Sequence, residues 1–356
     1  MLQGLVFSRA EKTTCRVRFF MIGDIMETLF AQLPLFLLIL IFIVSLIGLT
    51  KSADLLVENA VKIAEAIGIP ELIIGATIVS LGTTLPEVAT SITSIINGSA
   101  ELALGNAVGS IVTNMTLVLG VGALAGLLPV AQSVAKNFSI FFGFSLLLIL
   151  ASFNQIPTKF PMAAGNIPNV IGWIFLLALP VYLMISFRKS KSTTKISTET
   201  ARPHQSLIKP ILLIFLAALL VAFFASTLVS SVKTGARLLG VPETIIGATI
   251  VALGTSLPEL TTIFSAAKKG YGALAVGNVL GANILNLLLV LGLSIAINPG
   301  GMPVPAVYFN QIFPIMLLTL ITLAIFIYNS KIKVISRKEG IWLLFIYLVY
   351  LILNTH

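Results

Sequence analysis

Ten apolar stretches of roughly membrane-spanning length fill most of the chain, and they constrain its fold more than any other feature. A transmembrane helix needs about 20 apolar residues, and backbone N–H and C=O groups find no water to bond inside a bilayer. Each stretch is therefore expected to be a helix that crosses the membrane. The stretches lie near residues 34–56, 72–96, 103–126, 137–153, 169–187, 210–232, 244–267, 273–297, 309–328 and 340–354.

The composition agrees with a membrane protein and excludes several other classes. Of 356 residues, 57% are hydrophobic and 10% are charged, far from the balance of an average soluble domain. The net charge of +9 does not indicate nucleic-acid binding, because the lysines and arginines fall mostly in the predicted loops. The single cysteine, Cys15, cannot form a disulfide within the chain, and two histidines leave few imidazole sites for zinc or haem. We therefore expect a multi-pass protein of the cell membrane, with no cofactor and no protein partner that the sequence identifies.

The chain contains an internal duplication with a constant offset of 172 residues, as from Glu87 to Glu259. Residues 68–120 align without a gap on residues 240–292, and about half of the aligned positions are identical. Most of the match lies in GIPELIIGATIVSLGTTLPE of the first copy and GVPETIIGATIVALGTSLPE of the second. The same offset carries the later apolar stretches of the first copy onto those of the second, so each copy is expected to hold five helices.

An odd number of spans in each copy determines how the two copies are oriented. The second copy begins after five crossings and so starts on the opposite side of the bilayer. The expected fold is an all-α integral membrane protein of ten transmembrane helices in two inverted-topology five-helix repeats. The basic loops are cytoplasmic if the N-terminus is outside, although the basic residues of the N-terminal tail then lie on the wrong side. The expected organisation is an N-terminal tail at 1–32, a first repeat at 33–187, a cytoplasmic linker at 188–209 and a second repeat at 210–356.

A glutamate follows a proline in the middle of one predicted span of each copy. Glu87 lies in LGTTLPEVATS, and Glu259 lies in LGTSLPELTTI. An ionised carboxylate at the bilayer centre costs about 3 kcal/mol on insertion scales, and neither span offers a lysine or arginine. A bound cation is therefore the expected partner, since Ca²⁺ takes about 6 to 8 oxygen ligands and Na⁺ also prefers oxygen. The alternative is a protonated, hydrogen-bonded glutamate that only ties helices together.

Hydroxyl side chains accompany each glutamate on one helix face. Ser80, Thr83 and Glu87 follow i, i+3, i+7 spacing, and Thr84 lies beside them. The matching positions of the second copy are Ala252, Thr255, Ser256 and Glu259. The proline before each glutamate crowds the carbonyl four residues earlier, so backbone oxygens near each motif are released from helical bonding. Each motif thus gathers carboxylate, hydroxyl and carbonyl oxygens at one depth.

The helix after each motif adds a second polar row. The row is Asn106, Ser110 and Asn114 in GNAVGSIVTN of the first copy, and Asn278 and Asn286 in GNVLGANILN of the second. Asn114 and Asn286 are the stronger ligand candidates, because they recur eight residues after a repeated asparagine. Each helix also carries a glycine pair, Gly105 and Gly109 or Gly277 and Gly281. Small-residue faces of this kind let helices approach closely, which would bring the asparagine and glutamate helices together.

The doubled motif resembles the two alpha-repeats of the cation/calcium exchanger superfamily, particularly the compact prokaryotic-type sodium/calcium exchangers. The residues that carry the resemblance are GATIVSLGTTLPE and GATIVALGTSLPE, each followed by a GN-x-x-G helix. It spans both halves and implies four central sites shared between Ca²⁺ and several Na⁺. It further implies side-chain ligands at Thr83, Thr84, Glu87, Ser110, Asn114, Thr255, Ser256, Glu259 and Asn286, and backbone carbonyl ligands at Ser80 and Ala252.

The second copy departs from the family pattern at two positions. Many relatives have GSN-x-x-D where this chain has GANILN, so Ala282 replaces a serine and Asn286 replaces an aspartate. One fixed negative charge is therefore missing. Asparagine at the second position is similar to the potassium-independent animal exchangers, which favours transport without K⁺.

We expect a Na⁺/Ca²⁺ antiporter that works by alternating access, and not an enzyme. If the two ions compete for overlapping oxygen sites and the protein switches sides only when both glutamates are neutralised, exchange occurs without leak. The nearest alternative is an antiporter of H⁺ and Ca²⁺, or of another divalent cation, on the same scaffold; the hydroxyls favour Na⁺. Two other classes are an intramembrane aspartyl-type protease, which would use Asp pairs, and a passive channel, which would not couple Ca²⁺ uptake to a Na⁺ gradient.

Overall fold

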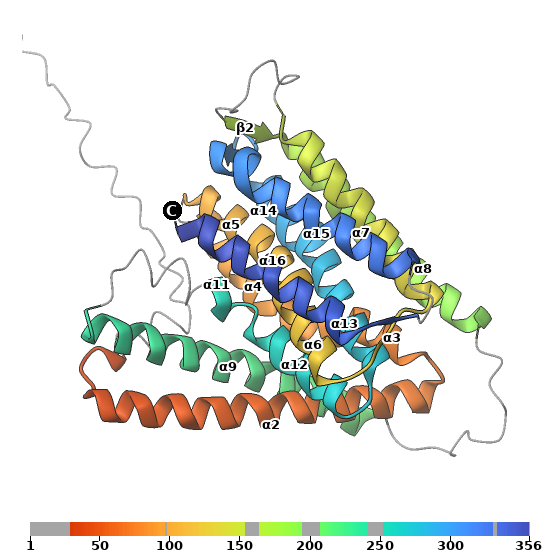
Figure 1. Ribbon diagram of the computed structural model, residues 1–356, viewed down its shortest axis with the longest axis horizontal. Coiled ribbons are helices and arrows are strands. Elements are labelled where there is room, and N and C mark those ends of the chain that lie inside the picture. The colour runs from red at the N-terminus through yellow and green to blue at the C-terminus, as the bar shows by residue number, and fades with distance from the viewer. Residues whose placement is uncertain are drawn as a thin grey trace, which may run out of the picture.

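The computed structural model describes residues 29–96, 98–153, 164–193, 207–240, 252–329 and 333–355, and these residues are mostly helical (Figure 1). The helices are α2 (Leu35–Ile67), α3 (Glu71–Ile74), α4 (Ser80–Ile96), α5 (Ala100–Thr113), α6 (Leu119–Ala125), α7 (Gln132–Ala151), α8 (Asn169–Thr193), α9 (Ile208–Leu238), α11 (Ala252–Gly254), α12 (Leu257–Lys268), α13 (Gly272–Leu285), α14 (Gly292–Ile297), α15 (Phe313–Asn329) and α16 (Arg337–Thr355). Four π-helical stretches continue some of them: η1 (Gly75–Val79), η2 (Asn114–Val118), η4 (Asn286–Leu291) and η5 (Tyr308–Ile312). Most of the expected N-terminal tail and linker lies outside the described residues.

Eight helical segments of the described chain are long and apolar enough to cross a membrane. They agree with eight of the ten stretches predicted from the sequence. The stretch near 244–267 is not among them, and residues 244–251 of it are not described. The stretch near 340–354 forms α16, whose first turn carries three charged residues, Arg337, Lys338 and Glu339. The helical membrane-spanning character is therefore confirmed, whereas the count of ten helices in two repeats stays a prediction.

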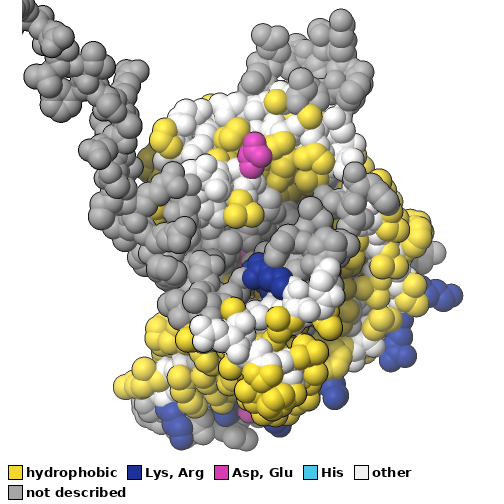
Figure 2. Space-filling view, turned by 90° about the vertical axis from the view of Figure 1, so that its left-hand side faces the viewer, with side chains coloured by type: hydrophobic (Ala, Val, Ile, Leu, Met, Phe, Trp, Pro, Cys, Tyr) yellow, Lys and Arg dark blue, Asp and Glu magenta, His cyan; other side chains and the backbone are white. Residues whose placement is uncertain are grey.

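Helices α2 and α9 form a pair that lies across the other helices (Figure 1). The contact between them has its own apolar cluster, made by Leu49 and Ala53 of α2 and by Val221, Ala225 and Leu228 of α9. The most deeply buried spans are instead 100–125 and 272–297, at the centre of the remaining helices. Hydrophobic side chains cover much of the outer surface, as expected where the solvent is lipid (Figure 2).

Two short antiparallel strand pairs join segments that are far apart in the sequence. Strand β1 (Leu128–Pro129) pairs with β4 (Val334–Ile335), and β2 (Ala164–Ile167) pairs with β3 (Met302–Pro305). The backbone N–H of Val130 extends the first pair by donating to the carbonyl of Lys333 at 2.6 Å. Each pair thus takes one strand from before the linker and one from after it.

The glycines of α13 allow this helix to lie directly against α3 and η1. A Cβ added at Gly277 would lie 2.2 Å from the carbonyl oxygen of Leu72, and one at Gly281 would lie 2.5 Å from the backbone of Ala76. The structure confirms the predicted close approach for this pair. Gly105 and Gly109 differ, because the nearest atoms to an added Cβ are tyrosine hydroxyls at 3.4 and 3.5 Å.

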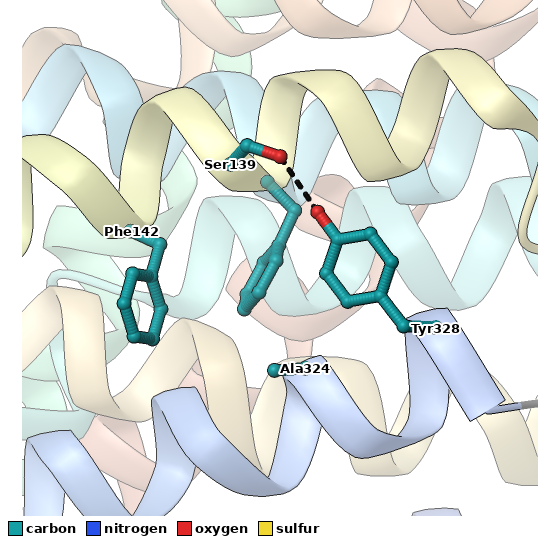
Figure 3. A pocket seen from close by; sticks show the side chains of 5 residues that line it. Ser139, Phe142, Ala324 and Tyr328 are labelled. Carbon is teal, nitrogen blue, oxygen red and sulfur yellow. Dashed lines mark hydrogen bonds between the residues drawn. The ribbon is translucent and has the colours of Figure 1, made fainter.

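A shallow groove of about 210 Å³ lies between α7 and α15 (Figure 3). It is lined by Phe138, Ser139 and Phe142 of α7 and by Ala324 and Tyr328 of α15. The hydroxyls of Ser139 and Tyr328 lie 2.6 Å apart across it, and Tyr328 also donates to the carbonyl of Ala135 at 3.0 Å. These bonds hold two outer helices together where few other polar groups are available.

Substitution of Gly277 by alanine should destabilise the protein, because the new Cβ would force α13 away from Leu72. Overpacking of this kind typically costs roughly 1–3 kcal/mol. We expect a lower melting temperature of the detergent-solubilised protein, measured by intrinsic fluorescence. Gly143→Ala on α7 is the matched control, since nothing lies within 4 Å of its added Cβ. Equal melting temperatures for the two variants would contradict the packing argument.

Candidate cation-binding site

The structure brings together the two glutamates that the sequence singled out. Glu87 of α4 and Glu259 of α12 are both 0% exposed. Their carboxylates are close enough to repel each other electrostatically. The two copies of the motif therefore contribute one acid each to a single buried volume.

Neither carboxylate has a positively charged partner among the described residues. All four carboxylate oxygens lack a hydrogen-bond partner there, and no basic side chain is among the groups that act on them. Removing a charge from water without compensation costs several kcal/mol. The site is therefore incomplete as a set of protein groups alone, and it favours a positive species between the two acids.

A threonine hydroxyl lies beside one of the two carboxylates, and other hydroxyls of the two motifs are buried. Thr83 lies beside the carboxylate of Glu259, so a side chain of the first copy reaches the acid of the second. Its hydroxyl lies 3.3 Å from the carbonyl oxygen of Ser80 and 3.4 Å from Oδ1 of Asn278. The hydroxyls of Thr84 and Ser256 are buried and have no partner in the described part of the chain. These oxygens are available to a cation.

The second copy breaks its helix where its hydroxyls lie. Helix α11 ends at Gly254, Thr255 and Ser256 form a turn, and α12 begins at Leu257. In the first copy, α4 instead continues through the equivalent positions with Pro86 inside it. The two motifs are thus similar in sequence and different in backbone. The break exposes backbone groups beside Glu259, as in helices that are interrupted at ion sites.

A contact between hydroxyls links the two halves next to the acids. Ser110 Oγ of α5 lies 3.5 Å from Thr255 Oγ1. Asn114 and Asn286 are fully buried, and neither side-chain amide has a partner among the described residues. Each of these asparagines also begins a π-helical stretch, η2 or η4. Such stretches are rare and often mark functional sites.

Asn106 has a different role from its repeat equivalent. Its amide donates to the carbonyl oxygen of Glu87 at 3.1 Å and to Ser91 Oγ at 2.9 Å, which ties α5 to α4. The equivalent Asn278 is 0% exposed, and its Nδ2 has no partner in the described chain. The two equivalent asparagines therefore have different contacts: Asn106 joins α5 to α4, and Asn278 lies beside Thr83.

Asn283 is a buried polar residue that the sequence analysis did not select. It is 0% exposed on α13, and both atoms of its amide lack partners among the described residues. Its repeat equivalent is Ile111, so the duplication gave no signal. An asparagine inside an otherwise apolar stretch was the one available indication.

Ala252 lies at the start of α11, and its burial is not described.

The chemistry of this site is that of hard-cation binding through oxygen. The described residues contain no group of three or more His, Cys, Asp and Glu side chains that could hold a metal ion. Two carboxylates with hydroxyl and amide oxygens instead resemble the ligand sets of Ca²⁺ and similar ions. The same neutral oxygens suit a monovalent ion.

Known proteins match this chain over most of its length. The family model described as "Sodium/calcium exchanger protein" matches residues 37–188 and 209–356. The sodium/calcium exchanger MaX1 of Methanosarcina acetivorans is 31% identical over 88% of this chain and 97% of its own length. The inner membrane protein YrbG of Escherichia coli is 30% identical over 80% of this chain and 87% of its own length.

The fold is also similar to solved structures. The sodium-calcium exchanger NCX_Mj, in a form soaked with Na⁺ and Sr²⁺, aligns with a TM-score of 0.73 and 27% sequence identity. The alignment covers 89% of this chain and 98% of that one.

Replacing one glutamate by glutamine should stabilise the cation-free protein and weaken the stabilisation that a bound cation provides. In a chelator, Glu87→Gln and Glu259→Gln should melt at a higher temperature than the unmodified protein, because each removes an uncompensated buried charge worth roughly 1–4 kcal/mol. Added Ca²⁺ should raise the melting temperature of the unmodified protein and have a smaller effect on the variants. Glu101→Gln, an exposed acid on α5, is the control and should respond like the unmodified protein. An undiminished Ca²⁺ response in both glutamine variants would contradict the site.

Proposed function

Because the chain belongs to the sodium/calcium exchanger family, we propose that it exchanges Na⁺ for Ca²⁺ by alternating access at the site between Glu87 and Glu259. It is a multi-pass membrane protein of the plasma membrane. Its relatives are transporters and not enzymes, and the Na⁺ and Ca²⁺ in their names are the transported ions proposed here.

The observation that carries this proposal is the pair of buried carboxylates without a positively charged partner among the described residues. One Ca²⁺ or two Na⁺ would balance two negative charges, whereas an empty site with both acids ionised would carry two uncompensated charges. Carrying such a charge through a state closed to water on both sides is unfavourable. The protein would therefore switch sides when loaded with either ion, and this condition couples the two fluxes.

The proposed ligands are those implied by the family resemblance. They are Thr83, Thr84, Glu87, Ser110 and Asn114 of the first copy, Thr255, Ser256, Glu259 and Asn286 of the second, and the carbonyl groups of Ser80 and Ala252. Burial and missing partners support Glu87, Glu259 and the two asparagines most directly. The carbonyl oxygen of Ser80 lies 3.3 Å from the Thr83 hydroxyl, and the Thr255 hydroxyl lies 3.5 Å from that of Ser110, so these groups would have to share or give up those contacts to bind a cation.

We further propose that ten spans form two inverted five-helix repeats, joined by a cytoplasmic linker near 188–209. The paired strands support this arrangement, since β1 and β3 occupy nearly matching positions of the two copies, as do β2 and β4. Exchanging the two halves would then place the β1–β4 pair where the β2–β3 pair lies, and the reverse. The left-handed Gly68 after α2 and Gly240 after α9 also match at the same offset.

Coupling to H⁺ is the main alternative on the same scaffold. Protons need a carboxylate but no ring of neutral oxygens. The unpartnered hydroxyls of Thr84 and Ser256 and the amides of Asn114 and Asn286 therefore favour Na⁺ as the counter-ion. Residue 286 is an asparagine and not an aspartate, so the site has no further fixed negative charge with which to bind K⁺.

Vesicles that contain the protein should take up Ca²⁺ when an outward Na⁺ gradient is imposed. The uptake should disappear in Glu87→Gln and in Glu259→Gln, because a single remaining carboxylate leaves a bound Ca²⁺ with an excess positive charge in a buried site. Radioactive Ca²⁺ uptake measures this, and Glu101→Gln should retain activity.

The same assay separates the alternatives. Uptake driven by a pH gradient without Na⁺ would identify a proton antiporter, and a requirement for K⁺ would identify potassium co-transport. Uptake that is independent of every counter-ion gradient would identify a passive channel. Near-normal Na⁺-driven uptake in both glutamine variants would contradict the proposed site.

A further inference from the structure

A charged cluster connects the α2/α9 pair to the helix that carries Glu259. Lys269, directly after α12, places its Nζ 3.0 Å from Asp54 Oδ1 and 2.9 Å from Glu58 Oε1. Ser265 of α12 donates to the same oxygen of Asp54 at 2.5 Å. Asp54 and Glu58 are four residues apart on α2, so one helix face presents both acids. We name these four residues the α2–α12 latch.

The latch lies at one end of the site and not within it. Ser265 follows Glu259 by six residues on α12, and Lys269 lies in the turn that leads to α13. This turn lies at the same end of the molecule as the end of α8 and the start of α9, which flank the linker (Figure 1). We call this end the linker face. The side chains of Asp54 and Lys269 are about 30% exposed, so the cluster is only partly open to water.

The other half has no latch at the matching positions. The offset that relates the copies carries Asp54 and Glu58 onto Ser226 and Ser230 of α9. It carries the latch serine and lysine back onto Thr93 and Asn97. Helix α4 moreover contains no lysine or arginine that could take the role of Lys269. The matched positions are therefore charged where α2 meets α12 and uncharged where α9 and α4 correspond.

Lys269 remains charged over the whole neutral range. Partial burial alone would lower its pKa, but the hydrogen bonds and charges of Glu58 and Asp54 outweigh this and hold the pKa above its ordinary value. The latch is therefore intact under the conditions in which transport is measured.

We propose that the α2–α12 latch holds the linker face closed and so makes the two access states unequal in stability. This inference rests on the proposed alternating access: a site that opens to the two faces in turn needs α2 to separate from α12 on the linker face. Separation there breaks two ion pairs and a hydrogen bond. The matched positions of the other half hold only uncharged side chains, so opening the other face breaks no ion pair between them. We call the end opposite the linker face the far face. The protein is therefore more stable in the state in which the site is open to the far face than in the state in which it is open to the linker face.

Removal of the latch should shift apparent Ca²⁺ affinity in opposite directions at the two faces. In Lys269→Gln, the Ca²⁺ concentration for half-maximal exchange should fall at the linker face and rise at the far face. Partly exposed ion pairs are weak, so we expect the ratio of the two values to change roughly threefold to tenfold. Right-side-out and inverted membrane vesicles measure the two faces separately. If Lys269 only stabilised the fold, Lys269→Gln would change the half-maximal Ca²⁺ concentrations at the two faces in the same direction.

Lys268→Gln is the matched control. It removes the same charge from the neighbouring position, but Lys268 lies 5.8 Å over the ring of Phe264 on its own helix and not on α2. It should leave the ratio unchanged. A chain with Asp54→Lys, Glu58→Lys and Lys269→Glu reverses every charge of the latch and should restore the original ratio. An equal ratio in Lys269→Gln and Lys268→Gln would overturn the proposal.

A second measurement does not depend on transport. Hydrogen–deuterium exchange of the purified protein should be faster over residues 54–67 of α2 in Lys269→Gln than in Lys268→Gln. Unchanged exchange in that segment overturns the latch whether or not the protein transports Ca²⁺. If the unmodified protein shows no Na⁺-dependent uptake but its α2 exchange depends on Lys269, the proposed function fails and the latch stands.

Discussion

The rest of the structure depends on the repulsion between two carboxylates that share one buried volume. Glu87 and Glu259 are fully buried and have no basic side chain acting on them in the described structure, so the described protein groups alone cannot balance their charge. The polar side chains that the structure buries with them, such as Thr84, Ser256, Asn114 and Asn286, are neutral and supply oxygen. The fold holds these groups in position with uncharged ties, such as the bonds of Asn106 to α4, and keeps its ion pairs at the periphery. A basic residue placed closer would satisfy the acids permanently and remove the need for a mobile ion.

Much of this site could be predicted from the sequence because duplication marks it. A glutamate in an apolar span is costly, and its recurrence at a fixed offset indicates a selected role without any alignment of relatives. The same offset selected Asn114 and Asn286, which are buried and unpartnered in the structure. The close packing of Gly277 and Gly281 followed from their spacing alone. These features are local patterns, and helix periodicity determines where they point.

Other features could not be predicted because they depend on which elements meet in space. The repeat equivalent of Asn283 is the apolar Ile111, so the duplication does not mark Asn283, which resembles any single polar residue in a span. The break at Thr255 and Ser256 is not visible in a motif that stays helical in its first copy. The contact of Lys269 with Glu58 joins residues 211 positions apart, and surface lysines near loops are common in membrane proteins. The offset did contain one indication, since acids in the first half correspond to serines in the second.

The strand pairs have a consequence for how such a chain can be built. Each half ends some of its loops in short strands whose hydrogen bonds are completed by the other half, β1 by β4 and β3 by β2. A half synthesised by itself would leave the backbone edges of these strands unpaired and would hold one acid instead of two. A second copy of the half would supply both the missing strands and the missing acid. With the two repeats inverted as we propose, the fold has the form of an antiparallel dimer whose subunits are covalently joined.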